Sequence, residues 1–206
     1  GYHFWTLKNN AYAACGAFGQ YCFIMPKEKL VLATTAGTNN AQPILNILSE
    51  ELIPHLKNSS CNNRKNDSSE LSEYLSSLIL SPQKGSYSVP MRDSLNGRTF
   101  SLKPNKHGIK KISFYFDPNS IEIFMKNGFR HTMSIGYNSW TMNNSLGILP
   151  WEYRHEPQEK SLAISGGWEN SDIYITKLFF CDTPHSIVIR YQFSFNQVSI
   201  QEYHHV

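Results

Sequence analysis

The residues of this chain that could act as nucleophiles are few, and none has an activating neighbour in the sequence. Cys15 would attack a substrate as a thiolate, but no histidine, lysine or arginine lies beside it to favour that ionised form. We therefore expect Cys15 to be structural or to line a substrate site. A Ser-x-x-Lys spacing, by which a lysine can activate a serine, occurs at Ser81 and Lys84. Pro82 follows that serine at the predicted end of a helix, so we expect no catalysis from this motif.

The residues that could bind a metal are scattered along the chain. The four cysteines show neither a C-x-x-C spacing nor a partnered histidine, so the sequence predicts no zinc site and no cofactor: Cys15, Cys22, Cys61 and Cys181. Unpaired thiols in a reducing compartment are preferred over a disulfide, which stays open as the alternative, and they favour a cytoplasmic location. The terminal pair His204 and His205 is interpreted as a solvated tail.

Three tryptophans and one charged trio are the remaining candidates for a site. Trp140, Trp151 and Trp168 either line a ligand cavity or pack in a core. The second interpretation is preferred, because small barrels fill their interiors with side chains. The consecutive Arg-His-Glu of residues 154–156 resembles a catalytic trio, but adjacent strand residues point to opposite faces and do not converge.

The composition is that of an ordinary globular protein, and 206 residues suffice for one large domain or two small ones. The net charge of +3 is spread along the chain and forms no basic stripe, which argues against nucleic acid as a partner. No apolar run approaches the roughly 20 residues needed to cross a bilayer, so no membrane span is predicted.

The elements that must position these residues begin with strands. We expect a strand over residues 2–7, two extended pieces between residues 11 and 26 hinged on Gly16 and Gly19, and an apolar strand from Leu30 to Thr35. The composition of the last strand predicts burial on both of its faces. A leucine pattern then marks an amphipathic helix with Pro43 in its first turn, which Pro54 should end or kink.

The second half of the chain changes to a period of two. Residues 58–69 are polar and rich in turn formers, which predicts a linker, and a short leucine-patterned helix follows and stops at Pro82. From Arg98 onward, alternating strands are separated by closely spaced turns, which predicts an antiparallel barrel of about eight strands. The expected fold class is α+β, with three parts: residues 1–57 as a small sheet with a C-terminal helix, 58–83 as a linker with a short helix, and 84–206 as the barrel.

A resemblance to a known family rests on the first of these parts. The run from Cys15 to Pro26, the apolar strand Leu30 to Thr35 and the leucine helix are similar to the C-terminal end of penicillin-binding-protein and class C β-lactamase-like serine hydrolases. The stretch Gly1-Tyr-His-Phe-Trp5 looks like the Gly-x-Gly-Trp strand of that family. The part from Lys84 onward resembles, more loosely, an all-β, lipocalin-like domain that is appended to some of these hydrolases, with matches at Gly166-Gly-Trp168 and at the turn Thr183-Pro184.

The resemblance implies where an active site would lie. The catalytic serine and lysine of the family would lie upstream of Gly1. The strand that carries the Lys-Thr-Gly or His-x-Gly triad in the family corresponds here to Ala14, Cys15 and Gly16. Ala14 replaces the expected lysine or histidine, which is a departure from the pattern. The backbone N–H of Ala17 would supply half of the oxyanion hole.

These expectations lead to one main hypothesis and its alternatives. Since the chain begins at Gly1 and not at Met, we expect a fragment or processed piece of a serine hydrolase of the esterase, peptidase or lactamase type. It would lack catalytic competence alone, and its first partner would be the missing N-terminal part of the hydrolase domain. The alternative is a lipocalin-like module that binds a small ligand or has a structural role. A third expectation is a homodimer through the exposed strand Leu30 to Thr35.

Overall fold

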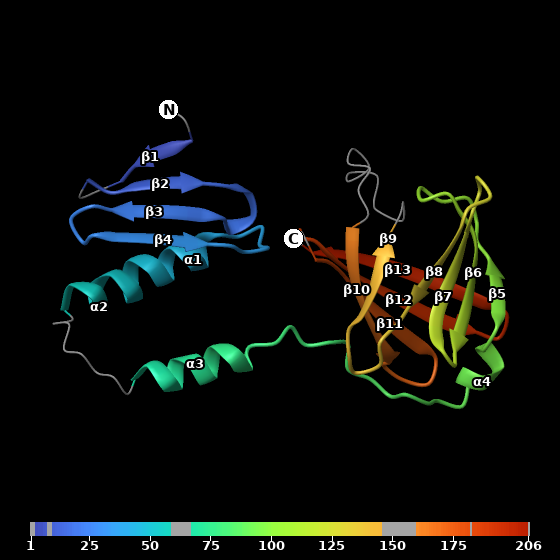
Figure 1. Ribbon diagram of the computed structural model, residues 1–206. Helices are drawn as coiled ribbons and strands as arrows, with labels where there is room; N and C mark the ends of the chain where they lie inside the picture. The colour runs from blue at the N-terminus through green and yellow to red at the C-terminus, as the bar shows by residue number, and fades with distance from the viewer. Residues whose placement is uncertain (1–2, 8–9, 59–66, 146–159, 182, 206) are drawn as a thin grey trace. The chain divides into compact units, whose positions relative to one another are not determined.

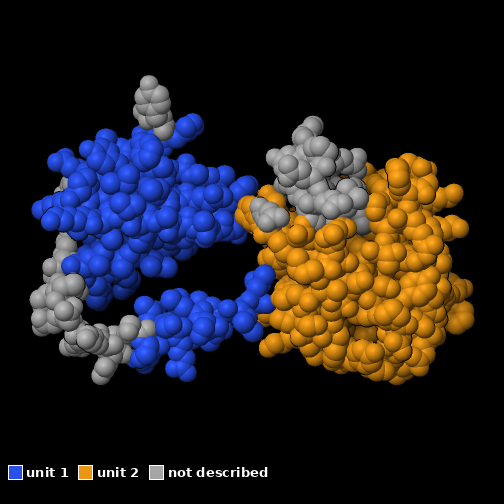
Figure 2. All heavy atoms as spheres, in the orientation of Figure 1, with its two compact units in different colours: residues 1–80, 206 blue, residues 81–205 orange. Residues whose placement is uncertain are grey.

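The structure, a computed structural model, describes residues 3–7, 10–58, 67–145, 160–181 and 183–205 (Figure 1). The chain divides into two compact units, residues 1–80 and residues 81–205 (Figure 2). We call them unit 1 and unit 2. In the described part of the chain, no helix is both long enough and apolar enough to cross a membrane.

Unit 1 is a four-stranded antiparallel sheet followed by helices. The sheet has the order β1-β2-β3-β4, with the strands β1 (Phe4–Thr6), β2 (Tyr12–Cys15), β3 (Tyr21–Met25) and β4 (Leu30–Thr34). A continuous helical run follows as α1 (Gln42–Asn46), a π-helical turn (Ile47–Leu52) and α2 (Ile53–Asn58), and α3 (Asp67–Ser77) comes later. Pro43 lies in the first turn of α1, as predicted. Pro54 does not end the helix, which continues to Asn58 after the wider π turn.

Most large apolar side chains of unit 1 are exposed. Ala13 and Met25 are its buried apolar residues in the described ranges, whereas Trp5 and Val31 are 64% and 67% exposed. The strand β4 alternates between half-buried and exposed positions, so the prediction that it is buried on both faces is wrong. It lies at the edge of the sheet and pairs with β3 alone, and this leaves its outer edge and the face around Val31 uncovered.

Unit 2 consists of two antiparallel sheets and one short helix, α4 (Arg92–Leu95). The first sheet has the order β5-β6-β7-β8, with the strands β5 (Arg98–Ser101), β6 (Ile109–Phe116), β7 (Asn119–Met125) and β8 (Arg130–Ser134). The second has the order β13-β12-β11-β10-β9, with the strands β9 (Thr141–Ser145), β10 (Lys160–Trp168), β11 (Ile173–Phe180), β12 (Ser186–Ser194) and β13 (Gln197–His205). Two-residue turns such as Phe195–Asn196 join neighbouring strands.

The core of unit 2 is a cluster of aromatic side chains contributed by both sheets. Phe114 of β6 is completely buried, and its ring centroid lies 4.9 Å from that of Phe193 and 5.1 Å from that of Tyr191, both on β12. Trp168 of β10 lies 5.3 Å from Phe116 on the opposite sheet. The alternating apolar positions of the strands therefore face one another across the two layers.

The α+β prediction is wrong. The chain is mostly β, with antiparallel sheets of four, five and four strands. No side chain of α1 or of the π turn is fully buried. The helices therefore add little to a core, and the sheets carry it.

The predicted barrel does not close either. At one side of unit 2 the two sheets are linked, because the Asn143 amide on β9 exchanges hydrogen bonds of 2.8 Å with the backbone N–H and C=O of Ser134 on β8. At the other side, β5 and β13 are edge strands that pair with β6 and β12 alone. The strand β5 has only four residues and β13 has nine, so β5 is too short to pair along the whole of β13. We call this open side the seam.

Candidate functional site

The residues that the resemblance assigns to the triad strand lie at the end of β2. Ala14 and Cys15 are its last residues and pair in register with Cys22 and Tyr21 of β3. The N–H of Gly16 donates to the carbonyl of Gln20 at 2.8 Å, which closes the turn between the strands. Ala17 is exposed and opens a 3-10 turn, Ala17–Gly19.

The turn after β2 holds two residues in the left-handed region of backbone space. Phe18 has φ of 61° and Gly19 has φ of 82°. A Cβ at Gly19 would lie 2.9 Å from Cδ1 of Ile44 on α1, so this position needs glycine for space as well as for conformation. A bulky residue in the left-handed region costs about 1–2 kcal/mol and is found preferentially at functional sites. The exposed Ala17 is therefore followed directly by a constrained stretch of backbone.

The cysteines that the structure describes form no disulfide. Cys15, Cys22 and Cys181 are all free cysteines, and Cys61 lies outside the described residues. Within the described ranges, no group of three or more histidine, cysteine, aspartate and glutamate side chains is placed to hold a metal ion.

The single Ser-x-x-Lys motif lies in extended chain. Ser81 and Lys84 follow the end of α3 at Ser77 and belong to no helix. The N–H of Gln83, between them, donates to Oγ of Ser165 on β10 at 3.0 Å, which anchors the segment to unit 2. A serine and a lysine three positions apart in an extended chain do not share the helical face that this type of catalysis uses.

Trp168 packs in the core of unit 2, whereas Trp140 is half-buried and lies outside the core cluster. Trp168 is only 1% exposed, and Trp140 makes an edge-to-face contact with Phe179 at 5.4 Å. Trp151 and the trio at residues 154–156 lie outside the described residues.

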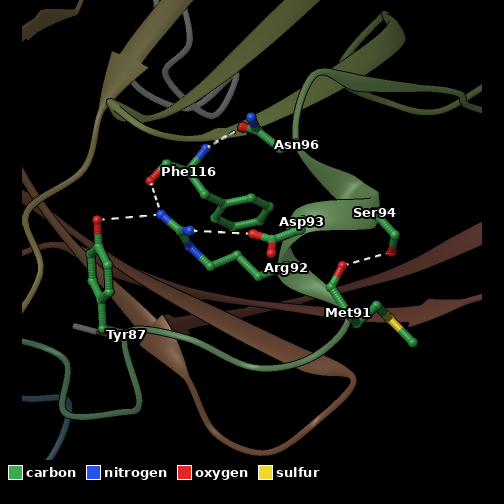
Figure 3. A network of polar contacts seen from close by, with 7 residues as sticks. All are labelled: Tyr87, Met91, Arg92, Asp93, Ser94, Asn96 and Phe116. Atoms are coloured by element: carbon green, nitrogen blue, oxygen red, sulfur yellow. Dashed lines mark hydrogen bonds and ion pairs between the residues drawn. The ribbon is translucent and has the colours of Figure 1, made fainter.

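A half-buried arginine lies in a polar network of unit 2 (Figure 3). The guanidinium of Arg92 donates to the carbonyl of Phe116 and to the hydroxyl of Tyr87 at 3.3 Å, and it forms an ion pair of 3.5 Å with Asp93. Asn96 accepts a hydrogen bond of 2.9 Å from the N–H of Phe116. The hollow beside this network measures about 10 Å³, which is room for about one water molecule. We interpret the network as structural.

An apolar cavity lies between the two sheets at the side of the seam. Its volume is about 70 Å³, and it is lined by apolar side chains from both layers, among them Ile112, Met133 and Leu178. Pockets for drug-sized ligands measure about 300–1,000 Å³, so the interior of unit 2 is largely filled by its own side chains.

Polar side chains surround Glu202 at the mouth of this cavity. The carboxylate of Glu202, on an inward position of β13, lies 2.9 Å from Nε2 of His107 and 3.6 Å from Nε2 of His204. Nζ of Lys106 lies 3.8 Å from the same carboxylate. The side chain of Glu202 is 25% exposed. An inward-pointing charge on an edge strand is a known protection against uncontrolled strand pairing.

A groove of about 980 Å³ runs along the seam between β5 and β13. Phe100, Val198 and Ile200 form its apolar part, and it meets the mouth of the cavity at Glu202. Sequence reasoning missed this groove and treated His204 as part of a solvated tail. The available signal was the period of two in β13, where Val198 and Ile200 are followed by Glu202 and His204 on the same face.

Comparison with known proteins adds no relative: no family model, no curated protein and no solved structure matches this chain.

Proposed function

We propose that this chain is the C-terminal portion of a β-lactamase-like serine hydrolase and has no catalytic competence alone. In this proposal, residues 1–57 contribute one wall of the active site, and unit 2 is an accessory module. The observation that supports the proposal is the turn after β2, in which the exposed Ala17 is followed by two residues with left-handed backbone. Ala17 is the residue to which the resemblance assigns an oxyanion-hole N–H. Such a donor belongs to the backbone, so it survives the replacement of the family's lysine or histidine by Ala14.

The exposed apolar surface of unit 1 supports the same proposal. Trp5 and Val31 are exposed, and very few apolar residues of this unit are buried. A sheet and helix with so small a core need further apolar surface to pack against. The rest of a hydrolase domain would supply that surface, and its catalytic serine would be brought to the end of β2.

We propose that unit 2 either has a structural role or positions a substrate. The reason is the small size of its cavity. A volume of about 70 Å³ is too small for the ligand of a typical small-molecule site. The lipocalin-like ligand-binding alternative is therefore the less favoured of the two.

The substitution Ala17→Pro tests the proposal in the product of the complete open reading frame. Proline removes the N–H and nothing else of consequence, because Ala17 is the first residue of its turn and the preceding Gly16 is extended, with φ of −101° and ψ of 173°. We expect kcat for ester hydrolysis to fall by about 10²–10³-fold, as for loss of one oxyanion donor. Ala17→Ser keeps the N–H and serves as the matched control, with activity close to that of the wild type. Equal activity of the Ala17→Pro and Ala17→Ser proteins would overturn the proposal.

A further inference from the structure

The seam of unit 2 exposes unpaired backbone groups on both of its sides. Directly after β5, the N–H of Leu102 donates to the carbonyl of Lys110 at 2.9 Å. In an antiparallel ladder the residues that bond to the neighbour alternate, so Thr99 and Ser101 turn their N–H and C=O groups away from β6 and toward the groove. The outer edge of β5 is therefore open to another strand.

The strand β13 presents the same feature across the groove. Its hairpin with β12 closes on the pair Ser194 and Gln197. The ladder bonds to β12 then fall on every second residue from Gln197, and the backbone groups of Val198 and Ile200 face the groove. Open edges of this kind are the usual receptors for an extended peptide, which gains main-chain hydrogen bonds by adding a strand.

The side chains of the groove add a chemical preference. Its apolar part includes Phe100, which is 5% exposed, with Val198 and Ile200 half-buried beside it. Three cations line it, Arg98, Lys103 and Lys106, against the single carboxylate of Glu202. The guanidinium of Arg98 donates to the neutral amide oxygen of Asn196 at 2.6 Å. With neutral histidines the groove carries two more positive than negative charges, so it is complementary to an acidic segment.

We propose that the seam binds an extended acidic segment of a partner protein by strand addition. Alternate side chains of such a segment fall on opposite faces. The apolar ones pack on Phe100, Val198 and Ile200, and the acidic ones reach Arg98, Lys103 and Lys106. A second copy of this chain is a poorer occupant, because its own edge strand β4 (LVLAT) has no acidic residue and its β13 has one.

Direct binding to short peptides tests the proposal. The probe is a fluorescein-labelled peptide of about eight residues with alternating Glu and Val, and its matched control alternates Lys and Val. Fluorescence anisotropy with residues 1–206 should show saturable binding of the Glu peptide, and binding of the Lys peptide at least about tenfold weaker. Raising the salt concentration should weaken the binding of the Glu peptide. Absence of saturation up to about 1 mM, or equal binding of the two peptides, overturns the proposal.

Variants of the protein and of the peptide separate charge from strand pairing. The double substitution R98E/K103E should lower the affinity for the Glu peptide by about tenfold or more. The substitution K177E on β11, outside the groove, should leave that affinity within about twofold of the wild-type value. Circular dichroism checks that each variant is folded. Two further Glu-Val peptides are N-methylated at alternate amides, one at the odd positions and one at the even positions. At least one of the two should lose binding, because N-methylation removes the backbone donors that pair with the edge strand. Three results would each overturn the proposal. They are retained binding of both methylated peptides, a loss of affinity in K177E equal to that in R98E/K103E, and self-association through the seam that the peptide does not compete away.

Discussion

Truncation of Phe114 is the sharpest test of the two-sheet core of unit 2. Phe114 is completely buried, and its ring contacts side chains of both sheets, including Phe100 at 6.0 Å, Tyr191 at 5.1 Å and Phe193 at 4.9 Å. The substitution Phe114→Ala therefore opens a cavity at the place where the layers meet, and the neighbouring rings cannot all collapse into it.

The expected loss of stability can be worked from the buried surface. A buried phenylalanine removes about 150–250 Å² from water. At about 25 cal/mol per Å² this gives about 4–6 kcal/mol, which is an upper estimate because the unfolded chain already buries part of that area. Measured Phe→Ala substitutions in cores cost about 3–5 kcal/mol. We expect Phe114→Ala to lower the free energy of unfolding of unit 2 by about 4 kcal/mol.

Urea denaturation followed by near-ultraviolet circular dichroism measures this loss, because the aromatic cluster of unit 2 gives that signal. With a denaturant dependence of about 2 kcal/mol per M, the midpoint should fall by about 2 M. Phe129 is 65% exposed, so Phe129→Ala is the matched control and should change the stability by no more than about 0.5 kcal/mol. A loss below about 1.5 kcal/mol for Phe114→Ala, or equal losses for the two variants, would refute the packing of the two sheets around this ring.

Three further predictions concern ionisation, thiol access and assembly. Burial raises the pKa of Tyr174 to about 12 and also raises the pKa of Tyr191, both from a usual value of 10.0. Above pH 10 the unfolded chain therefore loses these protons before the folded chain does. The free energy of unfolding of unit 2 should then fall by up to about 1.4 kcal/mol for each tyrosine and each pH unit between about pH 10 and 12. Equal urea midpoints at pH 9 and 11 would contradict this prediction. Cys15 is exposed and Cys22 is half-buried, so a thiol-specific reagent should modify Cys15 faster, and equal rates would argue against the described end of β2. The uncovered edge of β4 predicts a homodimer at a protein concentration of tens of micromolar (order of magnitude for weak association). The substitution Val31→Lys should dissociate this dimer. A monomeric sedimentation profile of the wild type would speak against it.

Many strands of unit 2 could be predicted from the sequence because apolar residues alternate along them. Ile112, Phe114 and Phe116 alternate along β6, and all three are buried. About eight strands were predicted from Arg98 onward, and the structure has nine there in its described part, β5–β13. The strand β9 was missed because its sequence, TMNNS, holds two asparagines, which are depleted in strands. Pairing with β10 and the bonds of Asn143 to Ser134 hold it in place, and these are contacts that the local sequence does not reveal.

Closure of the barrel could not be predicted, because local alternation is the same in a barrel and in two open sheets. It depends on whether the first and last strands meet, and β5 is too short to match β13. The groove could not be predicted for the same reason, because it depends on how strands far apart in the sequence come together. His107 and Glu202 are 95 residues apart in the sequence and meet only because the two sheets share a core. The turn at Ala17 was easier to anticipate, since Gly16 and Gly19 mark it directly.

The central claim is that this chain contributes a wall to an active site whose nucleophile lies outside residues 1–206. Labelling the product of the complete open reading frame with a fluorophosphonate probe, followed by mass spectrometry of its peptides, tests that claim most directly. The account predicts one labelled serine in a Ser-x-x-Lys sequence outside these residues, and no label on Ser81. A label on any serine within residues 1–206, or no labelled serine anywhere in the protein, would contradict it.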